Sequence, residues 1–515
     1  MSPSILTRRQ LLASLSALPA LAQTPGRAPT RTPKFSSYPF SLGVASGEPS
    51  PNGFILWTRL APDPLREGGM NGDDVAVEYQ VAEDERMSKV VAKGETAAKQ
   101  ELAHSVHVEI DSLRPNRWYY YQFKSGSEVS PVGRARTAPE PGRMLDQMRF
   151  AFASCQHYET GYFTALEHMA KEDLDLVVHL GDYIYEGPGQ DDRIRKHTGD
   201  EIVSIADYRN RLAQYKTDKD LQAAHLACPW LVTWDDHEVD SNYADRFSEK
   251  ADVSVDEFLT RRAHAYQAYY EHMPLRLSAK PVGHDMQLYR RVPFGRLLDF
   301  QVLDTRQYRT DQPCGDKSGP ECAAVFDPAA TILGDKQEQW LYEKLKTSPS
   351  KWNCIAQQVM VARVDRNADP DGESYSMDKW SAYRPMLNRF LRFLDEEKPS
   401  NPVVITGDIH SNWVCDIEAD YSKPDSKVVG TEFIGTSISS SGDGSQSLEY
   451  AEAMERKNSS VKFHNRERGY VSCTVTPERW QADYQVVEYV TRPGAPLITR
   501  ASFEVGDGKP GAVRL

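Results

Sequence analysis

The sequence lacks an internal apolar run of membrane-spanning length, has few cysteines and carries fewer basic than acidic residues. Lys and Arg number 61 against 74 Asp and Glu, so the formal net charge is −13. Without a basic stripe the chain has no bulk attraction for a polyphosphate backbone, and we expect no stable nucleic-acid complex and no membrane span. Low-complexity tracts are also missing, while 25 Tyr, 17 Phe and 9 Trp supply aromatic side chains for a core. This composition predicts a globular protein of two or three domains.

The 7 cysteines are too few for a disulfide scaffold, and their odd number leaves at least one unpaired. Cys314 and Cys322 flank a loop-like stretch, where a local disulfide is feasible. Cys354 lies in an apolar run and Cys473 in a strand-like run, so we expect both to be buried, unreactive thiols.

Residues 1–22 have the features of an export signal. Arg8 and Arg9 precede a short apolar stretch, and a cleavage site of small residues follows at 20–22. The arginine pair resembles a twin-arginine signal, which implies export by the twin-arginine machinery and a secreted or periplasmic location. An ordinary secretory leader is the alternative. Residues 23–36 are rich in Pro and Thr and predict a disordered spacer.

Residues 37–140 have an all-β pattern. Runs of β-forming residues, some alternating in polarity, are separated by turn residues. The expected strands are 54–58, 75–81, 105–110 and 118–123. Short strands at this spacing indicate a small β-sandwich, and the Pro-Glu-Pro-Gly stretch at 139–142 marks its end.

Residues 141–515 change character, because apolar strand-like runs now alternate with helical segments. The expected strands are 150–154, 176–180, 230–234 and 403–406, and the expected helices are 162–171, 208–215, 255–270 and 335–345. Such alternation predicts a layered α/β domain.

Each of these four strands is followed at once by residues of types that bind metals. They are Cys155 after the first strand, Asp182 and Tyr185 after the second, Asp235, Asp236, His237 and Glu238 after the third, and Asp408 and His410 after the fourth. Ligands bind beyond the carboxyl ends of the strands in open α/β sheets, so we expect these clusters to converge on one site. His179, in the middle of a strand, and His107 are interpreted as structural.

Carboxylates at contact distance raise one another's pKa unless cations neutralise them. Carboxylate oxygens suit Ca²⁺, Mg²⁺ or Fe³⁺, whereas a thiolate, a phenolate and an imidazole nearby favour a more Lewis-acidic transition ion. We therefore expect a mixed site of two or more metal ions. Ions about 3.5–4 Å apart can clamp a phosphoryl group and activate a water, which indicates phosphoester hydrolysis.

Seven short motifs carry a resemblance to a known family. They lie at 43–49, 56–59, 153–156, 181–186 (Gly-Asp-Tyr-Ile-Tyr-Glu), 234–238 (Trp-Asp-Asp-His-Glu), 303–308 and 407–410. With these motifs the sequence resembles the PhoD-like alkaline phosphatase family of metallophosphoesterases, from the leader to about Glu488. The resemblance implies an exported phosphomonoesterase and phosphodiesterase. It also implies an immunoglobulin- or fibronectin-like sandwich, a calcineurin-like αββα sandwich domain, and Fe³⁺ and Ca²⁺ as cofactors.

The resemblance further implies roles for single residues. Asp182 would bridge two metals, while Tyr185 and Cys155 would bind iron as phenolate and thiolate. His237 would stand beside the leaving group. The remaining implied ligands are Asp235, Asp236, Asp408 and His410, without an assignment of each to one ion.

Related enzymes often have a histidine ligand after the run 352–362, and here Gln357, Gln358 or a water is expected in its place. Four arginines are candidates to hold phosphate oxygens through bidentate contacts, although each could equally form a structural ion pair. They are Arg209, Arg306, Arg384 and Arg468.

The expected reaction is direct attack of a metal-bound hydroxide on phosphorus, with no covalent phosphoenzyme. The predicted catalytic residues are Asp182 and His237, and His237, oriented by Glu238 or a neighbouring carboxylate, would protonate the leaving oxygen. Ser154 is the one serine placed for a competing nucleophilic mechanism. Two other functions stay open: a phospholipase D-like phosphodiesterase acting on lipid or polymer phosphodiesters, and a calcium-dependent extracellular binding protein. The protein is expected to be a monomer.

Overall fold

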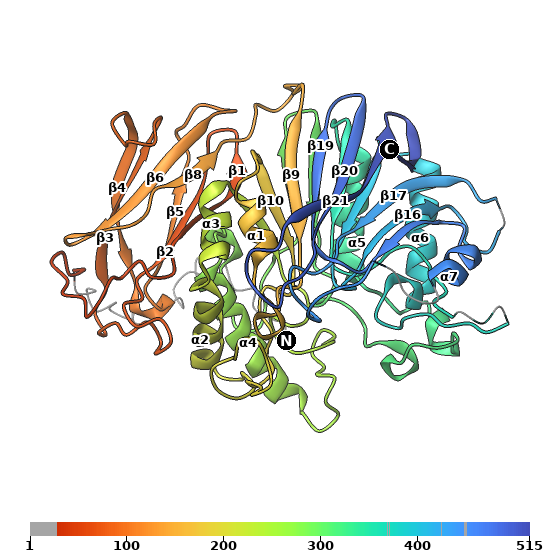
Figure 1. Ribbon diagram of the computed structural model, residues 1–515, viewed down its shortest axis with the longest axis horizontal. Helices are drawn as coiled ribbons and strands as arrows, with labels where there is room; N and C mark the ends of the chain where they lie inside the picture. The colour runs from red at the N-terminus through yellow and green to blue at the C-terminus, as the bar shows by residue number, and fades with distance from the viewer. Residues whose placement is uncertain (1–27, 368, 370, 424, 447–450) are drawn as a thin grey trace, which may run out of the picture.

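The computed structural model describes residues 28–367, 369, 371–423, 425–446 and 451–515 (Figure 1). The expected leader, residues 1–22, and the first part of the expected spacer lie outside these residues. Within them, no helix combines the length and the apolar character needed to cross a membrane.

Two large sheets form the centre of the molecule (Figure 1). In spatial order, the ten-stranded sheet contains β22 (Lys509–Arg514), β21 (Leu497–Gly506), β20 (Arg479–Val487), β19 (Arg468–Val475), β9 (Met148–Ala153), β10 (Leu176–Leu180), β11 (Trp230–Thr233), β1 (Val44–Ser50), β2 (Gly53–Arg59) and β5 (Ser105–Ile110). The seven-stranded sheet contains β12 (Arg290–Phe294), β13 (Leu298–Val302), β14 (Trp352–Ala356), β15 (Pro402–Thr406), β17 (Val428–Ile434), β16 (Asn412–Glu418) and β18 (Val461–Asn465).

The alternation of side chains along the central strands explains the layers. On β9, Phe150 and Phe152 pack into the apolar cluster between the two sheets, where they meet Phe300 and Val403 of the seven-stranded sheet. Ala151 lies between them in sequence and points the opposite way, into the cluster beneath the helices. Each strand therefore contributes to two cores at once.

Helices cover the outer faces and complete an αββα sandwich. The ten-stranded sheet is covered by α1 (Thr164–Met169), α2 (Ile205–Lys216), α3 (Lys219–Ala227) and α4 (Val255–His272), and the seven-stranded sheet by α5 (Gly334–Thr347) and α6 (Arg384–Glu397). The remaining helices are α7 (Ala451–Lys457), η1 (Gln100–Leu102), η2 (Tyr158–Thr160), η3 (Leu277–Ala279), η4 (Pro313–Asp316), η5 (Ala323–Phe326) and η6 (Trp380–Ala382). All strands and helices predicted from the sequence are present. The prediction omits α3, α6 and α7 and the strands outside those expected, which include most of the seven-stranded sheet.

The small β-sandwich shares one of its layers with the large sheet. Its separate layer contains β4 (Val90–Ala98), β3 (Val75–Ala82), β6 (Trp118–Ser125) and β7 (Glu128–Val129), with β8 (Gly133–Arg136) paired to β6. This layer packs on β1, β2 and β5 through an apolar cluster that includes Phe54, Val77 and Tyr121. Gly47 of β1 pairs with Trp230 of β11. A Cβ on Gly47 would lie 2.7 Å from the Trp230 carbonyl oxygen, so the junction requires glycine.

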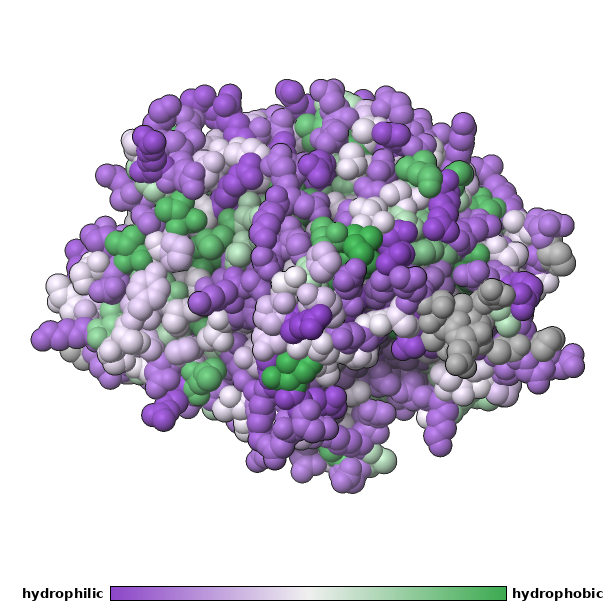
Figure 2. All heavy atoms as spheres, viewed as in Figure 1, coloured by the Kyte–Doolittle hydropathy of each residue, from purple (hydrophilic) through white to green (hydrophobic). Residues whose placement is uncertain are grey.

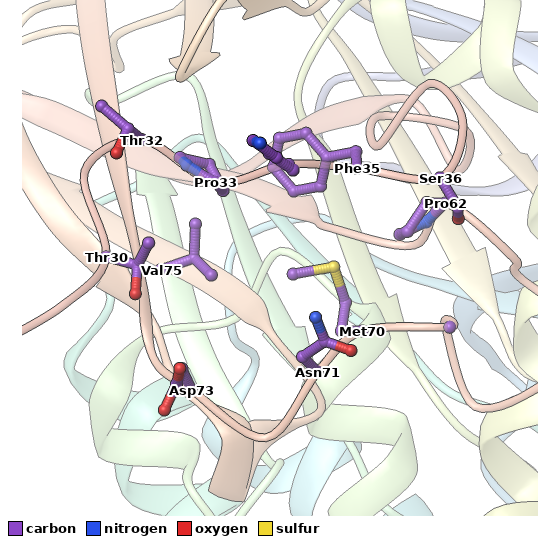
Figure 3. A pocket seen from close by; sticks show the side chains of 12 residues that line it. Thr30, Thr32, Pro33, Phe35, Ser36, Pro62, Met70, Asn71, Asp73 and Val75 are labelled. Carbon is purple, nitrogen blue, oxygen red and sulfur yellow. The ribbon is translucent and has the colours of Figure 1, made fainter.

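Residues 28–36, within the expected disordered spacer, lie along the small sandwich. The amide N of Thr30 donates to the carbonyl of Asp74 at 2.9 Å, and that of Ala76 donates to the carbonyl of Thr30 at 3.0 Å. Phe35 and other residues of this segment line a surface hollow on the sandwich (Figure 3). Backbone pairing with β3 therefore orders a segment whose composition indicates disorder. On the face shown in Figure 2, hydrophobic residues occur in small separate patches among hydrophilic ones.

The cysteines follow the expectation from the sequence. Cys314 and Cys322 form a disulfide. Cys354 and Cys473 are buried free thiols between the two sheets.

Candidate metal centre

Four candidate ligands occupy the same position relative to their strands. Cys155, Asp182, Asp235 and Asp408 each lie two residues beyond the end of a strand, namely β9, β10, β11 and β15. The first three strands are parallel neighbours, and β15 lies in the facing sheet. Their carboxyl ends therefore open at one edge of the sandwich, where α/β sheets bind ligands.

The backbone is strained at three of these four positions and at His410. Cys155, Asp182 and Asp408 have φ angles of +59°, +54° and +63°, and His410 has +54°. This left-handed region costs a residue with a Cβ about 1–2 kcal/mol, and such conformations persist where surrounding contacts impose them. Here the amide N of Cys155 donates to the carbonyl of Gly181 at 3.1 Å, which ties the β9 loop to the β10 loop. The loops hold one another in place.

All seven predicted ligands lie together, with His237. Three overlapping groups form, and in each the ligand atoms lie within 4.8 Å of one another. The groups are Cys155, Asp182 and His410; Asp182, Asp236 and His237; and Asp235, Asp236 and Asp408. Asp182 and Asp236 belong to two groups each and so join the three groups into one cluster of metal-ligand side chains, the nest. The Tyr185 hydroxyl donates to Asp182 Oδ2 at 2.9 Å and lies 3.1 Å from His410 Nε2.

The nest fits metal ions. Among the described residues, Asp182 Oδ1 and Asp235 Oδ2 are buried without a hydrogen-bond partner. Burial, together with nearby carboxylates, raises the pKa of Asp182 to about 8 and that of Asp235 to about 6. Burial also raises the pKa values of the Tyr185 phenol and the Cys155 thiol well above their usual ranges. Cations would satisfy the orphaned oxygens and favour the ionised forms of all four groups.

Two basic side chains, Arg306 and Lys379, already neutralise part of this charge, and only Arg306 was a candidate from the sequence. Its guanidinium is fully buried, donates to Asp235 and lies 3.4 Å from Asp236 Oδ1 and 3.6 Å from Asp408 Oδ1. Burial alone would raise the pKa of Asp236, but Arg306 and His237 outweigh it and lower that pKa. Lys379 contacts Asp408 through its Nζ. Lys379 follows no predicted strand, so no sequence pattern marked it.

The other three candidate arginines have different surroundings. Arg468 NH1 donates to the carbonyl of His410 at 2.7 Å and so supports a loop of the nest. Arg209 pairs with Glu271, and Arg384 pairs with Glu321. Neither glutamate is a candidate ligand, so Arg209 and Arg384 form the structural ion pairs that the sequence left open as the alternative to phosphate contacts.

His237 is oriented by Glu186 and not by Glu238. His237 Nδ1 lies 2.7 Å from Glu186 Oε2. Burial disfavours the charged imidazole, yet Glu186 and Asp236 outweigh it and hold the pKa of His237 well above its usual range. Glu238 instead accepts the backbone N–H groups of three residues, Asp182, Tyr183 and Asp235. Glu186 is the last residue of the Gly-Asp-Tyr-Ile-Tyr-Glu motif at 181–186, so this motif could have indicated a role for it.

Neither glutamine expected in place of a histidine is free to bind a metal. Gln357 donates to Thr406 Oγ1 at 2.7 Å, and its oxygen accepts from the amide N of Val359 and from Trp380 Nε1. Gln358 bonds Thr305 and Thr233. Both amides are occupied by protein partners, which leaves a water as the remaining alternative at this position.

A fourth group of metal-ligand types lies beside the nest, in His157, Glu159 and His197. Arg211 NH1 lies 3.1 Å from His197 Nδ1, and the Tyr215 hydroxyl lies 3.0 Å from His197 Nε2. With both ring nitrogens of His197 occupied and a guanidinium in contact, this group does not resemble a cation site.

Comparisons with known proteins agree with this arrangement. The sequence profile of the PhoD-like phosphatase family matches residues 150–484, and that of the PhoD-like phosphatase N-terminal domain matches residues 26–139. Alkaline phosphatase D of Bacillus subtilis (strain 168) is 52% identical over 478 residues, which make up 92% of this chain and 81% of that relative. A solved structure of PhoD superposes with a TM-score of 0.92 at 51% identity, over 94% of this chain and 93% of that one. The fold class expected from the sequence is thereby confirmed.

Proposed function

The chain belongs to the PhoD-like phosphatase family, and from this premise we propose that it is an exported alkaline phosphatase whose site holds Fe³⁺ with Ca²⁺ and hydrolyses phosphate monoesters. Family membership makes the chain a metal-dependent phosphatase, so the alternative of a non-enzymatic binding protein is set aside. The observation that carries the proposal is the nest itself, in which, within the described part of the chain, two buried carboxylate oxygens lack partners. Export rests on the Arg8-Arg9 leader.

The two ends of the nest differ in donor chemistry. Around one side of Asp182, Cys155 and His410 offer sulfur and nitrogen, and the Tyr185 phenol lies beside them. Such donors suit a Lewis-acidic transition ion, and we assign Fe³⁺ to this end. Asp235, Asp236 and Asp408 offer only oxygens, which suit Ca²⁺. Asp182 lies where it could serve both ends.

Ions bound in this nest would lower the pKa of a water and neutralise charge on phosphoryl oxygens. His237 holds a proton between Glu186 and Asp236, and its side chain is 23% exposed, so it can donate that proton to a leaving oxygen. Arg306 pairs with Asp235 and Asp378. We therefore assign it a structural role in the nest, and not the binding of phosphate oxygens.

The chain offers poor support for a serine nucleophile. Ser154 is 1% exposed, and its hydroxyl oxygen accepts the Cys155 thiol at 3.1 Å. A nucleophilic serine needs access to substrate and an adjacent base. We therefore propose direct hydrolysis without a phosphoserine.

The test combines elemental analysis with assays on p-nitrophenyl phosphate and bis(p-nitrophenyl) phosphate. We expect iron and calcium in the native protein, loss of activity with a calcium chelator, recovery with CaCl₂, and a higher kcat/KM on the monoester. Asp182→Asn should lower kcat/KM on the order of 10²–10³-fold. Asp111→Asn, an exposed carboxylate change in the small sandwich, is the matched control. An Asp182→Asn enzyme as active as the parent would overturn the assignment, and a higher kcat/KM on the diester would favour the phosphodiesterase alternative.

A further inference from the structure

The loop closed by the Cys314–Cys322 disulfide has an unusual backbone. Cys314, Gly315 and Asp316 are consecutive left-handed residues, with φ angles of +57°, +65° and +55°. This conformation is sterically unfavourable for residues with a Cβ, and strained residues of this kind cluster at functional sites. The disulfide joins the two sides of this loop. The direction in which the loop presents its side chains is therefore a structural requirement that needs an explanation.

The strained loop and its flank hold Asn242. Asp316 Oδ2 accepts Asn242 Nδ2 at 2.6 Å. Gln312, just before the disulfide, donates through Nε2 to the carbonyl of Asn242 at 2.7 Å and to Asp378 Oδ1 at 3.1 Å. Asn242 is itself left-handed, with a φ of +50°. Its side chain and its carbonyl are thus both held from the disulfide loop side.

The third contact of Asn242 leads into the metal centre. Its backbone N–H donates to Asp236 Oδ2 at 2.7 Å. Asp236 belongs to two of the three ligand groups, and its other oxygen, Oδ1, lies 3.4 Å from Arg306. A carboxylate held at both oxygens cannot rotate freely. Asn242 therefore restrains one of the two oxygens of Asp236.

We propose that the Cys314–Cys322 loop is a positioning element of the metal centre, in which Asp316 acts through Asn242 to orient Asp236. The proposal rests on the proposed function and adds to it two side chains and a disulfide that lie outside the ligand set. The location of Asp316 agrees with this role. It lies half-buried near Asp378, whose negative charge disfavours a second carboxylate there, and the hydrogen bond from Asn242 opposes that cost.

The test compares four variants with the parent enzyme: Asp316→Ala, Asp316→Asn, the double variant Cys314→Ser/Cys322→Ser, and Ser318→Ala as an exposed control on the same loop. Each is measured by steady-state kinetics, by calorimetric titration of the calcium-depleted protein with CaCl₂, and by thermal unfolding. Asp316→Ala and the double variant should weaken Ca²⁺ binding and kcat/KM about tenfold, the effect of one lost hydrogen bond to a charged acceptor. Asp316→Asn keeps an acceptor for Asn242 and should stay within about threefold of the parent. Ser318→Ala should have the Ca²⁺ affinity and the kcat/KM of the parent enzyme.

Reduction by a dithiol gives an independent arm. The dithiol transfers two electrons and two protons to the Cys314–Cys322 bond, which yields two cysteine thiols and an oxidised dithiol. The parent should then fall to the level of the Cys314→Ser/Cys322→Ser variant, whereas that variant should not change. If the dithiol lowers kcat/KM equally in the parent and in the Cys314→Ser/Cys322→Ser variant, the dithiol acts on the metal ions. That result would contradict a role of the disulfide.

Failure of this proposal and failure of the proposed function look different. A parent protein without phosphatase activity would reject the function. An active parent whose Ca²⁺ affinity and kcat/KM are matched by Asp316→Ala and by the double variant would reject only the positioning role. If one of these variants unfolds, Asn242→Asp takes its place. Its carboxylate would face Asp316 and should weaken Ca²⁺ binding by displacing the backbone N–H that holds Asp236. Unchanged Ca²⁺ binding in Asn242→Asp would also reject the positioning role.

Discussion

The Glu186 carboxylate holds the His237 imidazole, with 2.7 Å between Oε2 and Nδ1. The other oxygen of Glu186 accepts the backbone N–H of Ser241 at 3.0 Å. The carboxylate is therefore fixed from two sides, and the imidazole presents Nε2 to the metal centre, 3.9 Å from Asp236 Oδ2.

This pair predicts a dependence on the leaving group. Glu186→Gln should lower kcat on p-nitrophenyl phosphate about tenfold and on an alkyl phosphate about 10²–10³-fold, because proton donation matters more when the leaving oxygen is basic. Steady-state kinetics on the two substrates checks this. Glu167→Gln, a change at a partly exposed position on α1, is the control. An equal fall on both substrates would contradict the proton-donor role of His237.

Glu238 predicts a stability effect at the centre of the site. Its carboxylate accepts three backbone N–H groups from the loops after β10 and β11. Glu238→Ala leaves these buried donors unpaired and should lower the free energy of unfolding of the metal-free protein by about 3 kcal/mol or more. It should also reduce the metal content. Urea unfolding and elemental analysis measure both, with the exposed Glu249→Ala as control. A variant as stable and metal-rich as the parent would show that these loops hold themselves.

Tyr185 predicts a colour. Burial and Asp182 keep its phenol neutral in the protein alone, so only a strongly Lewis-acidic ion would ionise it. A phenolate bound to Fe³⁺ should absorb visible light, and Tyr185→Phe should abolish or shift that band. Tyr183→Phe changes a buried neighbour that contacts His225 instead, and should leave the band unchanged. A colourless, iron-free yet fully active parent would contradict the iron assignment.

Lys216 predicts a pH dependence of stability away from the metal centre. Its Nζ lies 4.3 Å from the centroid of the Trp57 ring, and burial lowers its pKa from 10.5 to about 7. Between these values the unfolded chain holds a proton that the folded chain has lost, so this group adds stability as pH rises, by up to about 1.4 kcal/mol per pH unit. Below about pH 7 both states are protonated and the folded state carries the full burial cost.

The Lys216→Met variant has no titratable group at this position, so its stability lacks the pH dependence that Lys216 contributes. It should be more stable than the parent near pH 7, and its advantage should shrink as the pH rises toward 10. Urea unfolding at several pH values measures the difference. The exposed Lys219→Met should differ from the parent by a constant amount. A Lys216→Met advantage that does not change with pH would show that the lysine keeps its charge in the fold.

Much of this protein could be predicted from local sequence patterns. Apolar runs marked the central strands, and the candidate ligands Cys155, Asp182, Asp235 and Asp408 each lie two residues beyond the end of a strand. These signals survive in a single sequence because strand periodicity and the polar residues that end a strand are properties of neighbouring residues. The amphipathic pattern of α6, with Met386 and Phe390 buried, was equally local, and the prediction omitted it.

Tertiary structure alone decided the partners of the polar groups. Glu186 and Glu238 each lie within two residues of a candidate ligand, yet one holds His237 and the other holds backbone N–H groups. Arg306 and Arg209 look alike in sequence, and only Arg306 enters the nest. Such choices depend on which atoms come within about 3 Å after distant strands have packed, and a hydrogen bond forms or fails over less than 1 Å. Sequence periodicity locates a residue on an element, but it does not carry distances between elements.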